Sequence, residues 1–296
     1  MTIGVPDSCQ ESYSSAQAFR ARRGARTIET SDLQLHHLLQ FVQDKPEGER
    51  LKALGDVRVT MFSDDDYQTP ASVTTNGKEW LIADITMGAD RLFYGNGNGN
   101  GKWFEVGVGF LETLEEELAA LFTQPQTVTL PPWTKGPPNS KGHDSHDEDW
   151  FNHQAAQPDG YLLFDEQNIV TEKFRGGGLE ICDVLGPQNQ LICIKKAPVS
   201  TAPLNHLFAQ GVVAVETLRS DSEVRAKFLE QVAAHTPGHR LLHDFGTLRV
   251  VFGILLKDGQ DIRVDSLFAF AQVSLLQSVR RLRAMNAEVE VVAIHR

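Results

Sequence analysis

The stretch LEICDVLGPQNQLICIKK, residues 179–196, decides the fold expected for this chain. Its centre, residues 186–189, reads Gly-Pro-Gln-Asn, a turn signal flanked by β-branched and aliphatic residues, so the stretch predicts a β-hairpin. Both faces of the hairpin are largely apolar, which is typical of strands that are covered on each side. Glu180, Asp183 and Lys195 nevertheless lie in it, and buried charges are costly unless they are paired or bind a ligand.

The expected register of the hairpin pairs Leu185 with Gln190. Because side chains alternate between the two faces of a strand, one face would then carry Glu180, Cys182, Cys193 and Lys195. One interpretation is structural: Glu180 and Lys195 form an ion pair at the end of the hairpin. The other is chemical: Asp183 and Glu180 bind Mg²⁺, since carboxylate oxygens are the ligands that this ion prefers.

Two acids and a lysine are the groups that a magnesium-dependent phosphodiesterase needs. The ion activates water and offsets phosphate charge, while the lysine orients the nucleophile or stabilises the developing anion. With Asp183 on the first strand and Lys195 on the second, the hairpin resembles the PD-(D/E)xK nuclease core. It departs from that core at Cys193, which stands where the second acid belongs, and Glu180 would have to supply the missing carboxylate.

The segment after the hairpin, residues 200–218, predicts an amphipathic helix with an apolar stripe at helical spacing. His206 and Gln210 stand four residues apart and therefore share one face of it. A helix that bears a glutamine after the acid and lysine is also seen in Mrr-like nucleases. We expect both side chains to point toward Asp183 and Lys195, although local hydrogen bonding on a half-buried helix is an equally simple interpretation.

A family resemblance extends beyond the hairpin. The segments that carry it are DGYLLFDE (159–166), GGGLEICDVL (176–185), LICIKK (191–196), LNHLFAQG (204–211) and LRAMNAEVEVVAI (282–294). Together they resemble a bacterial family known only as "sporadically distributed protein", with no established activity. The resemblance covers about residues 50–296 and implies a short or truncated member from a mobile-element or phage-defence system.

Composition divides the chain into four expected regions. Residues 1–30 are polar and predict a poorly ordered N-terminal segment, and residues 31–123 predict an α+β region. Residues 124–158, rich in Pro, Gly and His, predict a linker whose HDSHDED run either binds a metal or is a solvated loop. Residues 159–296 predict an α/β domain with a mixed central sheet flanked by helices, compatible with a restriction-endonuclease-like core.

Charge and composition restrict the partners. The net charge of −11 gives no global basic surface for nucleic acid, so binding would need a local patch. The candidates are the arginines at residues 20–26 and those at residues 280–283, and either cluster is otherwise a solvated helix face. The sequence lacks a membrane-spanning apolar run and a signal-peptide pattern, so we expect a cytoplasmic protein without membrane contact. A protein partner or a homo-oligomer stays open.

Three functional classes follow. The first is a metal-dependent nuclease that uses Asp183, Glu180 and Lys195, with His206 and Gln210 nearby. The second is a catalytically inert recognition or interaction module on the same fold, which the cysteine at position 193 favours. The third is another nucleotide- or phosphoryl-processing enzyme that uses the same acids.

Overall fold

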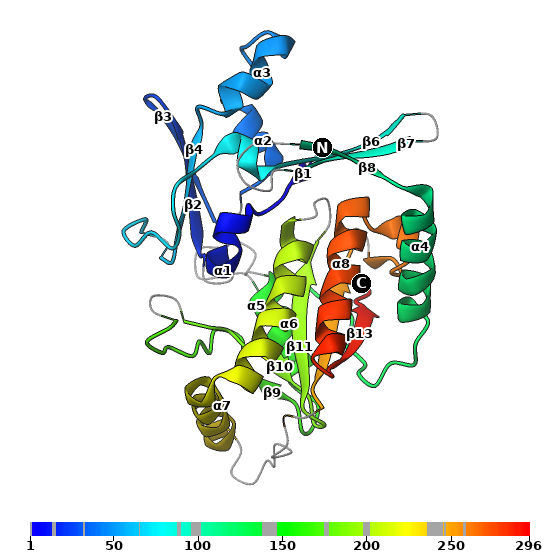
Figure 1. Ribbon diagram of the computed structural model, residues 1–296. Helices are drawn as coiled ribbons and strands as arrows, with labels where there is room; N and C mark the ends of the chain where they lie inside the picture. Colours follow the sequence, from blue (N-terminus) through cyan, green and yellow to red (C-terminus); the bar gives the residue numbers. More distant parts are fainter. Residues whose placement is uncertain are drawn as a thin grey trace. The chain divides into compact units, whose positions relative to one another are not determined.

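The computed structural model divides the chain into two compact units (Figure 1). Unit 1 comprises Met1–Thr113, Phe174–Gly178 and Ser200–His206, and unit 2 comprises the rest of the chain. The residues described are 2–13, 16–31, 33–64, 66–87, 90–95, 102–137, 147–174, 178–197, 202–235, 245, 247–256 and 259–296. None of the helices within these ranges is long and apolar enough to cross a membrane.

Unit 1 contains two four-stranded antiparallel sheets. One has the order β1-β6-β7-β8 and the other the order β3-β2-β4-β5. The strands of the first are β1 (Thr2–Ile3), β6 (Leu81–Met87), β7 (Asp90–Gly95) and β8 (Lys102–Val106). Those of the second are β2 (Ala18–Arg23), β3 (Arg26–Thr30), β4 (Arg58–Phe62) and β5 (Thr75–Asn76). The Gly-Asn repeat between β7 and β8 lies outside the described residues.

The helices of unit 1 are short: α1 (Gln10–Tyr13), α2 (Leu35–Leu39) and α3 (Glu47–Leu54). The prediction that residues 1–30 are poorly ordered was wrong, because β1, β2 and β3 form there. Phe19 and Ala21 of β2 point into the core of unit 1, which also holds Met61 and Trp80. Their alternation with arginines is a short strand signal that the polar composition of the segment hides.

Unit 2 is built on a five-stranded mixed sheet of order β13-β12-β11-β10-β9. Its strands are β9 (Leu162–Leu163), β10 (Val184–Leu185), β11 (Gln190–Lys196), β12 (Arg249–Leu255) and β13 (Glu288–Ala293). The first three pair antiparallel, while β11, β12 and β13 are parallel. Parallel neighbours need crossover connections. These are made by α6 (Ala202–Ser220) with α7 (Ser222–His235), and by α8 (Ala269–Ala284). The predicted α/β class with a mixed sheet is confirmed.

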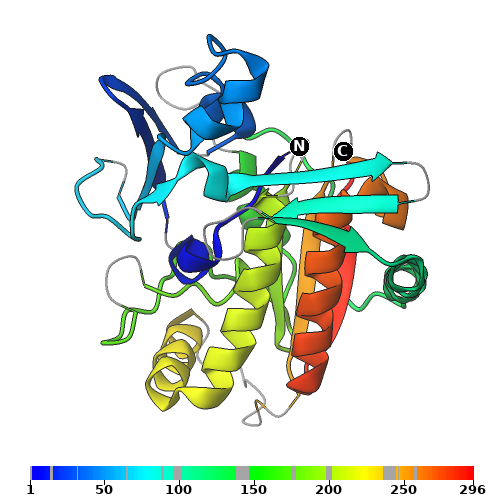
Figure 2. The same cartoon turned by 45° about the horizontal axis from the view of Figure 1, so that its top comes forward.

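Helices cover one face of this sheet closely. Both views show α6 and α8 lying side by side along it (Figures 1 and 2). The ring of Phe208 on α6 meets Phe252 of β12 edge-on, with the centroids 5.2 Å apart. A Cβ atom on Gly211 would come within 2.8 Å of the Phe252 ring, so this glycine sets the close approach of α6 to the sheet.

The opposite face is covered by the segment that was expected to be a linker. Val128, Trp133 and Phe151 of residues 124–158 are buried in one cluster with Ile192 and Ile194 of β11. Residues 147–155 form α5 (Asp147–Ala155), and the rings of Trp133 and Phe151 stack with centroids 4.5 Å apart. The linker prediction was wrong because these few large apolar side chains anchor a Pro-rich segment. Within the HDSHDED run, residues 143–146 lie outside the described range.

The register of the hairpin differs from the expected one by a single residue. Leu185 pairs with Leu191 and Val184 with Ile192, so the connection has five residues rather than four. Asn189 has a positive φ of 63°, and the N–H of Gly186 donates to the carbonyl of Gln190 at 2.8 Å. The turn signal marks the position of the connection but not its length, and one extra residue shifts every cross-strand pair.

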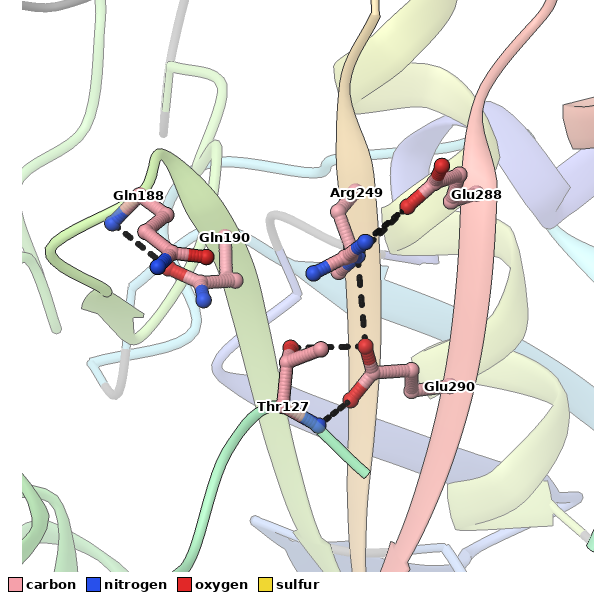
Figure 3. A network of polar contacts seen from close by, with 6 residues as sticks. All are labelled: Thr127, Gln188, Gln190, Arg249, Glu288 and Glu290. Carbon is pink, nitrogen blue, oxygen red and sulfur yellow. Dashed lines mark hydrogen bonds and ion pairs between the residues drawn. The ribbon is translucent and has the colours of Figure 1, made fainter. Parts of the chain in front are cut away.

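Helix α4 (Val108–Phe122), from Leu114 onward, and the segment after it complete unit 2. Figure 3 shows how this segment is held at β13: Glu290 accepts hydrogen bonds from the backbone N–H of Thr127 at 2.9 Å and from its hydroxyl at 2.7 Å. Arg249 of β12 forms ion pairs with Glu290 and with Glu288. The side chain of Glu290 is only 7% exposed, whereas that of Glu288 is 54% exposed.

This difference gives a test of the network. Glu290→Ala removes a buried acceptor of charge-assisted hydrogen bonds, so we expect the free energy of unfolding to fall by about 2–3 kcal/mol. Glu288→Ala, the matched control on the same arginine, should cost less than about 1 kcal/mol because an exposed ion pair contributes little. Urea unfolding of the two variants measures both values. Equal losses would mean that the Thr127 contacts do not hold the segment.

Candidate functional site

The candidate site lies where β10 and β11 part. Backbone pairing between the two strands ends at Asp183, whose N–H donates to the carbonyl of Ile192 at 3.0 Å. Beyond that point the N–H of Ile194 donates to Oδ2 of Asp183 at 2.6 Å, and the N–H of Lys196 to Oε2 of Glu148 at 3.4 Å. Side-chain carboxylates therefore replace the missing strand, because buried N–H groups must find an acceptor.

Three carboxylates converge at this point. Asp165 follows β9, and its N–H donates to the carbonyl of Asp183 at 2.9 Å. One carboxylate oxygen each from Asp165, Glu180 and Asp183 lies within 4.8 Å of the other two. Asp183 is buried, and Asp165 and Glu180 are half-buried. The arrangement thus brings together the two predicted acids and one that the sequence analysis did not select.

The surroundings disfavour ionisation of these acids. Burial, followed by repulsion from Asp165, raises the pKa of Glu180 from 4.5 to about 7. Burial and then repulsion from Glu180 raise the pKa of Asp183 well above its ordinary value, and burial also raises the pKa of Asp165. The group gains stability from protons or from a cation, because carboxylates at this spacing repel one another when all are ionised.

Lys195 provides a positive charge beside the acids. Burial alone would lower its pKa, but Glu148, and then Asp183 and Glu180, raise it above the ordinary value, so the ammonium stays charged. Its ion-pair partner is Glu148, from the first turn of α5. The expected Glu180–Lys195 pair is replaced by this one because the hairpin strands separate before they reach the position of Glu180.

Amide side chains hold the acids in place. Gln210 of α6 donates through Nε2 to Oε2 of Glu180 at 3.2 Å, and the N–H of Glu166 donates to Oε1 of Glu180 at the same distance. Asn152 of α5 donates a hydrogen bond to Asp165, which partly offsets the rise in that pKa. Asn152 is buried, and its Oδ1 has no hydrogen-bond partner among the described residues. A buried acceptor without a donor lies in the amide that contacts the cluster.

The other predicted residues have different surroundings. The ring of His206 lies edge-on to Tyr13 with the centroids 5.1 Å apart, and both residues belong to unit 1. The expectation that His206 points toward Asp183 and Lys195 stays a prediction. Cys193 is fully buried, and burial, followed by the charge of Asp183, raises the pKa of its thiol well above the ordinary value. A protonated buried thiol does not take the place of the acid that is expected two residues before Lys195.

Sequence reasoning missed Asn152 and Asp165, and it considered Glu148 only as part of the HDSHDED run at residues 143–149. Asp165 directly follows the short apolar run Tyr161–Phe164, a position where an acid at a strand end would stand out. Glu148 and Asn152 lie in the segment that was interpreted as a linker, so their helix was not recognised. The helical spacing of Phe151 and Ala155, both buried, is the signal that would have revealed it.

The raised pKa of Glu180 has a consequence for stability. Its folded pKa, about 7, lies above the ordinary 4.5, so the folded chain holds this proton more tightly than the unfolded chain. Folding stability from this group is therefore complete at low pH and is lost as the pH rises through about 7. Glu180→Gln keeps an acceptor for the N–H of Glu166 and removes the charge.

We expect Glu180→Gln to be more stable than the wild type at pH 8, by on the order of 2 kcal/mol. The advantage should nearly vanish at pH 4, below the ordinary pKa of 4.5, where Glu180 is protonated in the unfolded chain as well as in the folded one. Urea unfolding at both pH values, without divalent ions, makes the comparison, and Glu288→Gln on an exposed carboxylate serves as the control. A difference independent of pH would disprove the assignment of the raised pKa.

Comparison with known proteins places the chain in a family. No curated protein and no solved structure matches it. One family model does match, and it covers residues 1–295, including the N-terminal part that the resemblance in the sequence analysis left out. The chain therefore belongs to this family, which is described as a family of unknown function (DUF6119).

Proposed function

We propose that unit 2 is a magnesium-dependent phosphodiesterase that cleaves nucleic acid. The observation that carries the proposal is the convergence of Asp165, Glu180 and Asp183 beside the ammonium of Lys195. Phosphodiester hydrolysis needs negative ligands for the ion and a positive charge for the phosphate within one site. Here both arise where β10 and β11 part.

The donor set fits Mg²⁺. Carboxylate oxygens are hard ligands, and their mutual repulsion, expressed in the raised pKa values of Glu180 and Asp183, is relieved when a cation binds. The carbonyl oxygen of Asn152, which is buried and accepts no hydrogen bond from the residues that the structure describes, is a further hard atom in the amide that contacts Asp165. Asp165, Glu180 and Asp183 would hold the ion. When bound, Mg²⁺ lowers the pKa of a water ligand and offsets negative charge on the phosphate.

The remaining residues have supporting roles. The ammonium of Lys195 would bind a non-bridging phosphate oxygen and stabilise the charge that develops on it. Glu148 holds the ammonium in place, and its contact with the N–H of Lys196 ties α5 to the edge of β11. Gln210 fixes the carboxylate of Glu180 through its hydrogen bond. Each role fixes a charged or polar group in position before the reaction, so little free energy is spent on reorienting these groups in the transition state.

The fold supports the proposal in part. Three antiparallel strands followed by two parallel strands, with α6 after the lysine strand, are compatible with the restriction-endonuclease-like core that the hairpin resembles. The departure is Cys193, since no acid stands there. We infer that Glu180 and Asp165 replace that acid from the other side of the parted strands.

A second candidate is an inert recognition module. Glu148 already neutralises Lys195, and a structural ion pair at this place would look the same. The nuclease and the inert module differ in the cleavage activity that they predict when the charges of Lys195 and Glu148 are removed together.

The test uses Lys195→Met and the double variant Lys195→Met/Glu148→Gln. The single variant leaves the carboxylate of Glu148 without its cation, so it is expected to lose stability as well as activity. The double variant replaces both charges with neutral groups of similar size, so its stability should return toward that of the wild type. Cleavage of labelled single-stranded DNA, duplex DNA and single-stranded RNA, with Mg²⁺ or Mn²⁺, should still be at least about 100-fold slower.

Asp183→Asn and the exposed Asp265→Asn complete the design. The first should abolish cleavage and the second should leave it unchanged. If the double variant cleaves as fast as the wild type, Lys195 has no role in the chemistry. If the wild type cleaves none of the three substrates with either ion, the nuclease proposal fails and the inert module is favoured.

A further inference from the structure

An arginine-lined face of unit 1 lies on the sheet of β2, β3 and β4. Phe19 and Ala21 of β2 point into the core, so Arg20 and Arg22, which alternate with them, lie on the opposite face. The register sets Arg22 directly across from Arg58 of β4. The arginines of this segment lie on strands, whereas the sequence analysis interpreted them as a helix face.

Two nearby arginines have structural roles and do not belong to this face. Arg23 donates to the carbonyl of Phe41 at 3.1 Å, and Arg26 donates to the carbonyl of Gln40 at 2.6 Å. Arg20 is also satisfied: it pairs with Glu29 at 2.7 Å, and its guanidinium lies 4.8 Å from the centroid of the Phe62 ring.

Arg22 and Arg58 are different. Both are exposed, and neither has an acidic partner within 4.0 Å in the described part of the chain. Arg22 donates only to the carbonyl of Gly24, at 3.1 Å. Like charges directly opposite on neighbouring strands destabilise a sheet, and among the described residues no ion pair neutralises either member of this pair. An anionic ligand would offset it.

The face is also hollowed. Arg20, Arg22, Thr27 and Glu29 line an open concavity of about 420 Å³. The Cβ atoms of a directly opposed pair lie about 5 Å apart, and side chains two residues apart on a strand are separated by about 7 Å. Arg20, Arg22 and Arg58 therefore lie close together on one face of the sheet, and Arg20 and Arg22 also line the hollow.

We propose that this arginine face, defined by Arg22 and Arg58 beside the ion-paired Arg20, binds the phosphate backbone of a single-stranded nucleic acid. Guanidinium groups match phosphate oxygens with two parallel hydrogen bonds, and a row of them fits a polymer with one charge per unit. Contacts of this kind position a strand without reading its sequence. The net charge of −11 restricts such binding to a local face of this kind.

This inference does not depend on the nuclease proposal. It concerns residues of unit 1, and it is tested by binding in EDTA, where no metal-dependent cleavage occurs. The probes are a labelled 20-nucleotide single-stranded DNA and an RNA of the same sequence. Fluorescence anisotropy of the full chain measures affinity from low to moderate salt.

The variant is Arg22→Gln/Arg58→Gln. Its matched control, Arg263→Gln/Arg281→Gln, removes the same charge from two exposed, ion-paired arginines elsewhere. We expect the variant Arg22→Gln/Arg58→Gln to bind either probe at least tenfold more weakly at low salt. The slope of log affinity against log salt should fall by about 1.4. The control should bind like the wild type. The melting temperature of the first variant should stay equal or rise, because a repulsive pair is lost.

Three outcomes would overturn the inference: wild-type protein that binds neither probe, equal losses in the variant and its control, or a poly-glutamate of equal charge that displaces the strands as well as unlabelled DNA does. The last would identify an acidic polypeptide as the ligand. A fall in the melting temperature of the first variant would mean that Arg22 and Arg58 stabilise the sheet instead.

Discussion

The hydrogen bond from the N–H of Ile194 to the carboxylate of Asp183 is the interaction on which the structure of unit 2 depends. It stands where β10 turns away from β11 and leaves a buried strand edge without its ladder partner. A buried backbone N–H in this position needs an acceptor, and here the side chain of Asp183 provides it. The Asp183 carboxylate that accepts this hydrogen bond is therefore buried, and burial raises its pKa.

That burial organises the surroundings. The carboxylate of Asp183 attracts the ammonium of Lys195, and the ion pair with Glu148 keeps that ammonium charged. Asp165 and Glu180 complete a group that repels itself unless protons or a cation are present. Amides from α5 and α6 then fix the orientation of the acids, through Asn152 and Gln210. The parted strands thus explain both the fold around the hairpin and the candidate chemistry.

Much of this could be predicted from the sequence. The hairpin, the α6 helix and the closing strand follow from local patterns, and a charged Asp183 in an apolar strand indicates a site. The parting of the strands could not be predicted, because period-2 alternation continues through Glu180 and Cys182 although the ladder has ended. The helix that carries Glu148 and Asn152 could not be predicted for another reason. It packs through two or three apolar residues after a Pro-rich segment, and only tertiary contacts reveal that it is ordered.

The most direct measurement is a crystal structure of the protein grown with Mn²⁺, read by anomalous scattering. We predict a single strong peak bonded to carboxylate oxygens of Asp165, Glu180 and Asp183, with Lys195 still charged beside it. Crystals that contain Mn²⁺ at saturating concentration but show no peak within reach of these three oxygens would contradict the account. The acids would then be held by shared protons, and their convergence would be a structural feature of the parted strands alone.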